Sequence, residues 1–472
     1  MELIVILISL CLLMVFAFRG YSLILFAPLC AMLAAAMSDY SLMPLYSELF
    51  MTKAAEYVKV YYSIFLLGAV FAKVMEEAGM ARSIAAVIAK VLGKERAILS
   101  VILACGVLTY GGISVFVVAF VMYPFAAILF REANIPKRLI PATIWTGMCT
   151  YGMVALPGTP QIQNIIPTSF FGTTTWAAPI TGIFASVVYF VLTWFWITYR
   201  YKKLSARGEG YGNHTLNEPE MMDNSGLPSW KKSLIPLATV VIVNLLMSNP
   251  FHWSWAYHWG EQLLEPFKLL KLSLLASSVD KVQAIWSLDV GLTVGIVLAV
   301  IIGRKQLLQS GGIIAPLNAG TIGSVSAIMN TASGYAFGTV ISSLAGFQII
   351  KDQLLQIHIG SGPLVSEVIT TNIMSGFTGS ASGGMTIALN MLGANWLTWA
   401  NSLGMSPEIL HRIVSLSSAG FESVPHNGAL VTLIAICGLT HKQSYYDIFM
   451  LSVFKLAVPF LCIALYSTTG LL

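Results

Sequence analysis

The sequence predicts an all-α polytopic membrane protein, and three observations lead to this class. Of its 472 residues, 57% are hydrophobic and 10% are charged, whereas soluble domains carry about 25% charged residues. The mean hydropathy is +0.78. The apolar runs approach the ~20 residues that a helix needs to cross a bilayer. A chain with this composition has its apolar surface covered by lipid.

Apolar runs locate the membrane spans. They predict spans at 3–18, 21–37, 57–75, 138–153 continuing to about 172, 177–198, 233–247, 285–302, 334–350, 407–440 and 447–468. No basic residue precedes the first run, so we interpret it as a retained helix and not as a cleaved leader. The polar stretch 199–232 predicts a cytoplasmic linker. The cysteines lie in apolar runs without metal-ligand spacing, so no metal or other cofactor is expected.

Basic residues predict the orientation of these spans. Most Lys and Arg lie in the loops at 19, 73–97, 131–138, 199–232, 304–305 and 441–442, and basic loops stay on the cytoplasmic side. This orientation requires that the segments 97–130 and 361–392 each enter and leave the membrane on one side, as re-entrant hairpins with tips near 108–113 and 377–384. It also requires that 306–333 stays at the inner surface. The first hairpin then opens to the cytoplasm and the second to the outside.

The predicted elements form two inverted repeats, 1–198 and 233–472, joined by the linker 199–232. Each repeat has scaffold spans (3–75; 233–350), a hairpin (97–130; 361–392), a broken helix (138–172; 407–440) and a final span (177–198; 447–468). Two pairs of similar sequence stretches support the repeat. Gly111-Gly112-Ile113-Ser114 and Gly383-Gly384-Met385-Thr386 occupy the hairpin tips. At similar separations follow "PGTPQIQN" from Pro157 and "SVPHNGALVT" from Ser423.

The hairpin tips and helix breaks predict a binding site for a small carboxylate. Non-helical backbone at membrane depth is tolerated where it lines a cavity, and inverted repeats with broken helices place the substrate of secondary transporters there. Four helix N-termini would meet near one point, and helix N-termini bind anions. The candidate substrate ligands are Gly112, Ser114, Gly158, Thr159, Gln161, Asn164, Gly384, Thr386, His426, Asn427 and Gly428. Gln161, Gln163 and Asn164 are equally suited to satisfying open backbone groups.

Ionisable side chains at membrane depth are costly and usually functional. Glu422 stands at the end of a half-helix, where the dipole and burial disfavour its charge, so it is the candidate carrier of a coupling proton. His426 is a second candidate, although it can instead hydrogen-bond loop carbonyls. Glu367 and Arg412 each lie a short way into apolar segments, and we expect them to form an ion pair because neither is stable alone.

Three stretches resemble the GntP permeases: "SVPHNGA" (Ser423 to Ala429), "LTHKQSYYDI" (Leu439 to Ile448) and "NTASGYAFG" (Asn330 to Gly338). That family comprises gluconate, D-serine and hydroxybutyrate-type symporters of the ion transporter superfamily. The resemblance covers essentially the whole chain. It implies proton-coupled uptake of small hydroxy or sugar acids by an elevator-type domain on a dimeric scaffold. "LPGTPQIQN" (Leu156 to Asn164) looks more like the D-β-hydroxybutyrate branch, which favours a short monocarboxylate over gluconate.

These observations together predict a proton-coupled symporter of a small organic acid in the inner membrane, and not an enzyme. A sodium-coupled carboxylate transporter is the alternative, although the Ser-Asn-Thr sodium motifs of dicarboxylate relatives are absent from the hairpin tips. A passive channel and an intramembrane hydrolase are remote alternatives. The expected partners are the anionic substrate, protons, the lipid bilayer and a second copy of the chain. Nucleic acid is not expected, because the basic residues are scattered through loops.

Overall fold

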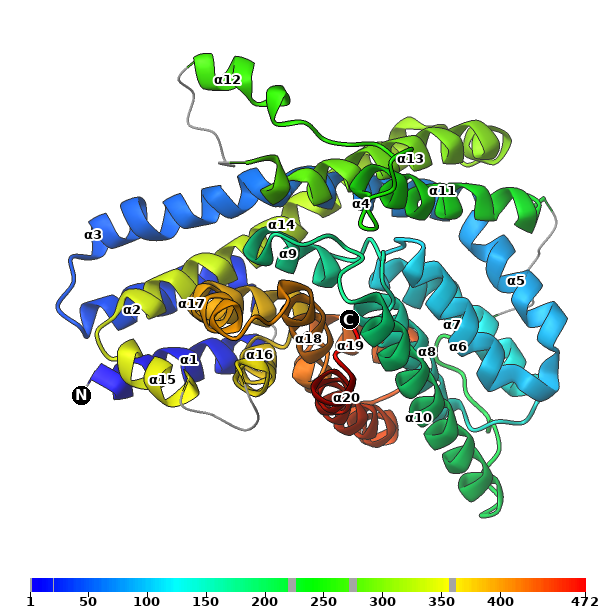
Figure 1. Ribbon diagram of the computed structural model, residues 1–472. Coiled ribbons are helices and arrows are strands. Elements are labelled where there is room, and N and C mark those ends of the chain that lie inside the picture. Colours follow the sequence, from blue (N-terminus) through cyan, green and yellow to red (C-terminus); the bar gives the residue numbers. More distant parts are fainter. Residues whose placement is uncertain (1, 20, 220–225, 271–277, 356–361) are drawn as a thin grey trace.

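The computed structural model describes residues 2–19, 21–219, 226–270, 278–355 and 362–472 (Figure 1). Over these residues the chain is built from helices and contains no β-strand, in agreement with the predicted all-α class. Six of the described helical stretches are long and apolar enough to cross a membrane, and a seventh qualifies if one bent pair is taken as a single span. The six are 42–77, Val115–Glu132, Pro179–Ser205, Trp230–Ser248, Gln283–Gln309 and His441–Thr469.

The first half of the chain runs from α1 to α10. Its helices are α1 Glu2–Phe18, α2 Leu23–Ala36, α3 Leu42–Pro44, the π-helix η1 Leu45–Met51, α4 Thr52–Glu77, α5 Met80–Leu92, η2 Lys94–Arg96, α6 Ala97–Tyr110, α7 Val115–Glu132, η3 Lys137–Leu139, α8 Ile140–Met148, the π-helix η4 Tyr151–Ala155, α9 Ile162–Phe171 and α10 Pro179–Ser205.

The second half runs from α11 to α20. Its helices are α11 Trp230–Ser248, η5 Glu261–Leu263, α12 Glu265–Leu269, η6 Val279–Lys281, α13 Gln283–Gln309, α14 Ile314–Ser343, α15 Phe347–Leu355, α16 Leu364–Thr378, α17 Ala381–Ser402, α18 Pro407–Ser418, η7 Phe421–Ser423, α19 Gly428–Ile436 and α20 His441–Thr469.

The two long helices α4 and α14 pack side by side through the middle of the molecule (Figure 1). The sequence predicted a span beginning at residue 334, but the helix α14 begins earlier, at Ile314. The placement of 306–333 at the inner surface stays a prediction. The small residues that look like a loop permit close packing instead. At Gly320, a Cβ atom would lie 2.6 Å from Val70 Cα, so only glycine lets α14 approach α4 this closely. Composition alone does not separate a loop from such a helix interface.

Both halves show the same order of elements after their long helix. α4 turns at Gly79, whose φ of +68° suits glycine, into α5. α14 bends by 94° into α15. A helical hairpin, a broken helix and a final long helix follow in each half (α6–α7, α8–α9, α10; α16–α17, α18–α19, α20). The domain boundaries and the inverted orientation of the halves stay predictions.

The hairpins lie close to their predicted positions. The first turns at 111–114 between α6 and α7, and the second turns at 379–380 between α16 and α17. Each second arm begins with a serine N-cap, Ser114 in one hairpin and Ser380 in the other, whose hydroxyl accepts a backbone N–H of the first turn. The second hairpin was expected to end at residue 392, but α17 continues to Ser402, and residue 361 lies outside the described residues.

Candidate functional site

The first hairpin tip is fastened to the first helix break. Gln161 donates from Nε2 to the carbonyl oxygens of Thr109 (2.7 Å) and Ile113 (3.2 Å). Tyr110 donates its hydroxyl to Pro157 O at 3.0 Å. A Cβ at Gly112 would lie 3.1 Å from the Pro160 ring. The Gln161 amide nitrogen is thus occupied by backbone carbonyls, which favours the structural role that the sequence left open for it.

The second hairpin tip lies against the second helix break. A Cβ at Gly379 would come within 2.6 Å of the His426 ring and 3.5 Å of Asn427 Cα. The His426 ring also interacts with the backbone at Gly376 and Phe377. The sequence offered hydrogen bonds to loop carbonyls as the alternative to proton transfer, but Gly376 and Phe377 lie in the last turn of α16.

Four helix N-termini therefore come together in two pairs. At the first tip these are α7 and α9, which begin after Ser114 and Gln161. At the second tip they are α17 and α19, which begin after Ser380 and Asn427. Free N–H groups and the positive end of the helix dipole suit each pair to a carboxylate. Thr386 is buried in the second turn of α17 and donates to Ser382 O at 2.7 Å, so it lies one turn beyond the tip, and its role as a substrate ligand stays a prediction.

Asn164 is fully buried, and both polar atoms of its side chain form hydrogen bonds within the protein. Its Nδ2 donates to Thr159 O (3.0 Å) and Thr175 O (2.7 Å). Its Oδ1 accepts from Arg412 at 3.0 Å and lies 3.2 Å from His411 Nε2. These contacts join the first broken helix to α18, so Asn164 links the two halves. Thr159 is similarly engaged, since its hydroxyl donates to Gly152 O at 2.9 Å.

Arg412 does not form the expected ion pair with Glu367. Its guanidinium donates from Nε (3.1 Å) and Nη2 (2.6 Å) to Ala177 O, and from Nη1 to Asn164. Both Arg412 and Glu367 are fully buried, and among the described residues no partner reaches either oxygen of Glu367. The prediction failed because carbonyl oxygens of the first half, which are distant in sequence, satisfy the arginine.

Glu422 is held by a lysine that the sequence analysis missed. Lys455 Nζ lies in the interior of α20 and donates to Glu422 Oε1 (3.0 Å) and Ser423 Oγ (2.8 Å). Trp145 of α8 donates to the same hydroxyl at 2.9 Å. Both charged groups are buried. A single lysine in an apolar span was the available signal, because such a residue is costly unless it is paired.

The remaining candidates are the asparagine cap and three glycines. Asn427 caps α19 by accepting Leu430 N–H at 2.9 Å, and it donates to Glu422 O at 2.9 Å. Gly384 lets α17 approach the Ser375 backbone of α16, and Gly158 faces the Trp176 ring at a φ of +77°. Gly428, the first residue of α19, differs from these. Apart from its chain neighbours and the backbone of its own helix, no described atom lies within 4 Å of the place where its Cβ would be.

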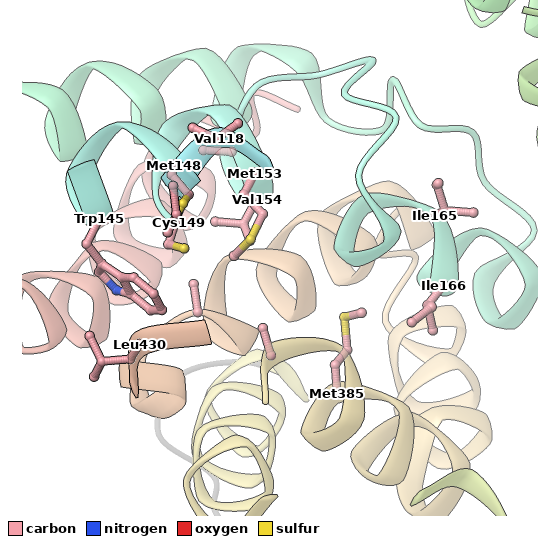
Figure 2. Packing of buried hydrophobic residues seen from close by; sticks show 14 of the residues in the cluster. Val118, Trp145, Met148, Cys149, Met153, Val154, Ile165, Ile166, Met385 and Leu430 are labelled. Carbon is pink, nitrogen blue, oxygen red and sulfur yellow. The ribbon is translucent and has the colours of Figure 1, made fainter. Parts of the chain in front are cut away.

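The helices around both breaks share one buried apolar cluster. Figure 2 shows Val118 of α7, Trp145 of α8, Ile165 and Ile166 of α9, Met385 of α17 and Leu430 of α19 in this cluster. One hollow near these helices has a volume of about 430 Å³ and lies at the end of α9, the end of α11 and the start of α18. Its lining includes none of the predicted substrate ligands.

A second buried ion pair, also missed from the sequence, joins α10 to α20. Arg200 donates to the two carboxylate oxygens of Asp447 at 2.6 and 3.3 Å. The sequence analysis placed Arg200 in the linker 199–232 and Asp447 at the start of the final span 447–468, because both are charged. Their partnership follows from the packing of α10 against α20, the last helices of the two halves.

Comparison with known proteins identifies the family. Over 478 aligned residues that cover the whole of both chains, the chain is 42% identical to a Bacillus subtilis protein named as the uncharacterized transporter YxjC. The chain belongs to the family of this transporter. A Haemophilus influenzae protein, also named as an uncharacterized transporter, is 25% identical over 369 residues, which are 76% of this chain and 74% of the other. No family model matches the chain.

Two solved structures share the fold of this YxjC relative. The Alcanivorax borkumensis YdaH transporter superposes with a TM-score of 0.59 at 13% identity, covering 95% of this chain and 98% of the other. The Neisseria gonorrhoeae protein MtrF, described as one of a class of antimetabolite efflux pumps, superposes with a TM-score of 0.55 at 11% identity and covers 95% and 94%. The protein is therefore a multi-pass membrane transporter of the YxjC family, and the predicted transporter class, as opposed to an enzyme, is confirmed.

Proposed function

We propose that the protein is a secondary transporter that couples the uptake of a small organic anion to the entry of protons. The observation that carries this proposal is the pairing of helix N-termini at the two hairpin tips, with N-caps Ser114 and Gln161 in one pair and Ser380 and Asn427 in the other. Such termini bind carboxylates. The resemblance to GntP permeases supports a hydroxy monocarboxylate such as 3-hydroxybutyrate, with a sugar acid such as gluconate second.

The proposal includes an elevator movement in the inner membrane. The hairpins and broken helices would move as one body, because they are joined across the halves by the contacts of Asn164 with Arg412 and of Ser423 with Trp145. The central pair of α4 and α14 would belong to the fixed scaffold, through which two copies of the chain would form a homodimer. The sequence predicted Glu422 and His426 at the second break as proton carriers, but the ammonium group of Lys455 balances the charge of Glu422 in this conformation.

Uptake into proteoliposomes tests the proposal. We expect purified protein to accumulate labelled 3-hydroxybutyrate when the outside is more acidic than the lumen, because proton entry then drives the anion inward. The initial rate should fall to that of protein-free vesicles when a protonophore removes the gradient. Unlabelled gluconate, added as a competitor, ranks the two substrate classes.

Three other outcomes would contradict proton-driven uptake. Accumulation that needs an inward sodium gradient would favour the sodium-coupled alternative. Flux that only equalises the substrate concentrations would favour a channel. Accumulation that requires an alkaline exterior would mean that the protein exports its anion against proton entry.

Gly428→Ala tests the location of the site. Alanine is a better helix former than glycine, and its methyl group would enter space free of described atoms at the N-terminus of α19. If the substrate carboxylate rests on this terminus, we expect KM to rise about tenfold, the equivalent of ~1.4 kcal/mol of binding, with unchanged folding.

Gly323→Ala on α14 is the matched control, because a Cβ at this position also has open space around it. Gly323 is distant from both hairpin tips in the sequence. It should leave KM unchanged. Equal KM values in the wild type and Gly428→Ala would place the carboxylate elsewhere.

A further inference from the structure

One face of α16, the first arm of the second hairpin, carries buried polar side chains whose oxygens have no partner among the described residues. Glu367, Thr370, Thr371 and Ser375 are spaced three, four and eight residues from the first, which places them on one face of a helix. All four are 0% exposed. Both carboxylate oxygens and all three hydroxyl oxygens have no partner within the part of the chain that the structure describes. Buried polar atoms in folded proteins are almost always paired.

The hydroxyls on this face behave differently from others in the chain. Thr143, Ser186 and Thr386, for example, donate to the carbonyl one turn earlier in their own helices. Thr370, Thr371 and Ser375 make no such bond. Their hydroxyls remain able both to donate and to accept a hydrogen bond.

Glu367 also has no charged partner. The helices that pack against α16 are α1, α15, α17, α18, η7 and α20. The described part of α17 has no titratable side chain. Those of the other helices are Cys11 on α1; Lys351 and Asp352 on α15; Glu408, His411 and Arg412 on α18; Glu422 on η7; and His441, Lys442, Tyr445, Tyr446, Asp447, Lys455, Cys462 and Tyr466 on α20. The buried charges among them are engaged elsewhere: Arg412 with Ala177 O, Lys455 with Glu422, and Asp447 with Arg200.

A carboxylate that is buried without a partner is far less costly in its neutral form than in its charged form. Glu422, by contrast, has the ammonium group of Lys455 at 3.0 Å to balance its charge. The side chain that is arranged to hold a proton in this conformation is therefore Glu367.

We infer that Glu367 is the binding site of the coupling proton, and that the hydroxyls of Thr370, Thr371 and Ser375, bridged by water when the hairpin moves, form the route between it and the hairpin tip. The inference rests on the proposed proton-coupled function. The route ends where Gly379 meets His426. The proton binds as the O–H of a neutral carboxyl group and leaves to water or a neighbouring hydroxyl when the hairpin moves, so no bond of the substrate changes.

Glu367→Gln tests the assignment in proteoliposomes. The amide keeps the shape of the side chain but carries no transferable proton. We expect pH-driven accumulation of 3-hydroxybutyrate to fall at least about tenfold, equivalent to ~1.4 kcal/mol of lost driving force. Exchange of labelled for unlabelled substrate should continue, because it needs no net proton movement. Glu265→Gln, which alters an exposed carboxylate on α12, is the matched control and should accumulate like the wild type.

Glu367→Asp keeps the proton-binding group and guards against a simple folding defect. It should retain part of the pH-driven uptake with a shifted pH profile. Thr371→Val removes one hydroxyl of the route and should slow pH-driven uptake several-fold without slowing exchange, whereas Thr398→Val on the exposed face of α17 should do neither. Full pH-driven accumulation in Glu367→Gln would overturn the inference, and so would sodium-driven uptake that this substitution abolishes.

An infrared measurement separates failure of this inference from failure of the proposed function, because it needs no substrate. The wild-type protein at neutral pH should show a carboxylic acid C=O band that is absent from Glu367→Gln and present in Glu265→Gln. If the band is seen but no carboxylate is taken up by the wild type under a pH gradient, the proposed substrate class fails and the proton site stands. If the two spectra are identical in this region, the proton site is wrong whatever the transport result.

Discussion

Lys455→Met should destabilise the folded protein by about 3–5 kcal/mol, the cost of removing one partner of a buried ion pair. Lys455 and Glu422 are 0% and 5% exposed at their side chains, and their charged atoms lie 3.0 Å apart. The substitution would leave the Glu422 carboxylate without its counter-charge and would remove a donor from Ser423. Titration with SDS in mixed micelles measures the free energy of unfolding.

The double variant Lys455→Met with Glu422→Gln supplies the sharper comparison. It removes both charges, so most of the lost stability should return. Lys268→Met, which breaks an exposed pair with Glu265, is the control and should change the free energy of unfolding by less than about 1 kcal/mol. A double variant as unstable as Lys455→Met would mean that the lysine stabilises the fold through its packing on the Trp145 ring, 5.7 Å away, and not through Glu422.

The positions of the hairpins and helix breaks could be predicted from the sequence because they depend on local chemistry. Gly111-Gly112, Gly379 and the prolines 157, 160 and 425 act on their own backbone, wherever the rest of the chain lies. The start of α14 could not be predicted in this way. Its small residues are explained by the neighbouring backbone of Val70, which comes from the other half of the chain.

The side-chain contacts of the candidate residues could be predicted less well than the fold, for the same reason. The sequence placed Gln161, Asn164 and Asn427 at the breaks, but their hydrogen bonds to Thr109 O, Arg412 and Leu430 N show what each side chain does there. The ion pairs were still harder to predict from the sequence. Arg412 was expected to find a carboxylate and instead binds carbonyl oxygens more than 200 positions away in the sequence. Such partners are determined by tertiary packing, which no local pattern encodes.

Arg412→Met should destabilise the protein by about 2–4 kcal/mol. A hydrogen bond from a charged donor contributes roughly 1.5–3 kcal/mol, and Ala177 O would lose both bonds that it accepts from this guanidinium. Relief of the cost of burying the charge offsets part of the loss. Arg412→Lys should be nearly as damaging, because an ammonium group lacks the planar fork that reaches Ala177 and Asn164 together.

Asn164 and Arg412 should behave as one unit in this experiment. The sequence placed Asn164 among the candidate substrate ligands, but the hydrogen bonds of its side chain to Thr159 O, Thr175 O and Arg412 predict that Asn164→Ala loses stability. The double variant should then lose less than the sum of the two single variants, by about 0.5–3 kcal/mol. Arg304→Met on the exposed face of α13 is the control and should be close to neutral. Additive losses would show that the arginine supports the first broken helix through Ala177 alone, and that the Asn164 contact does not couple the two halves.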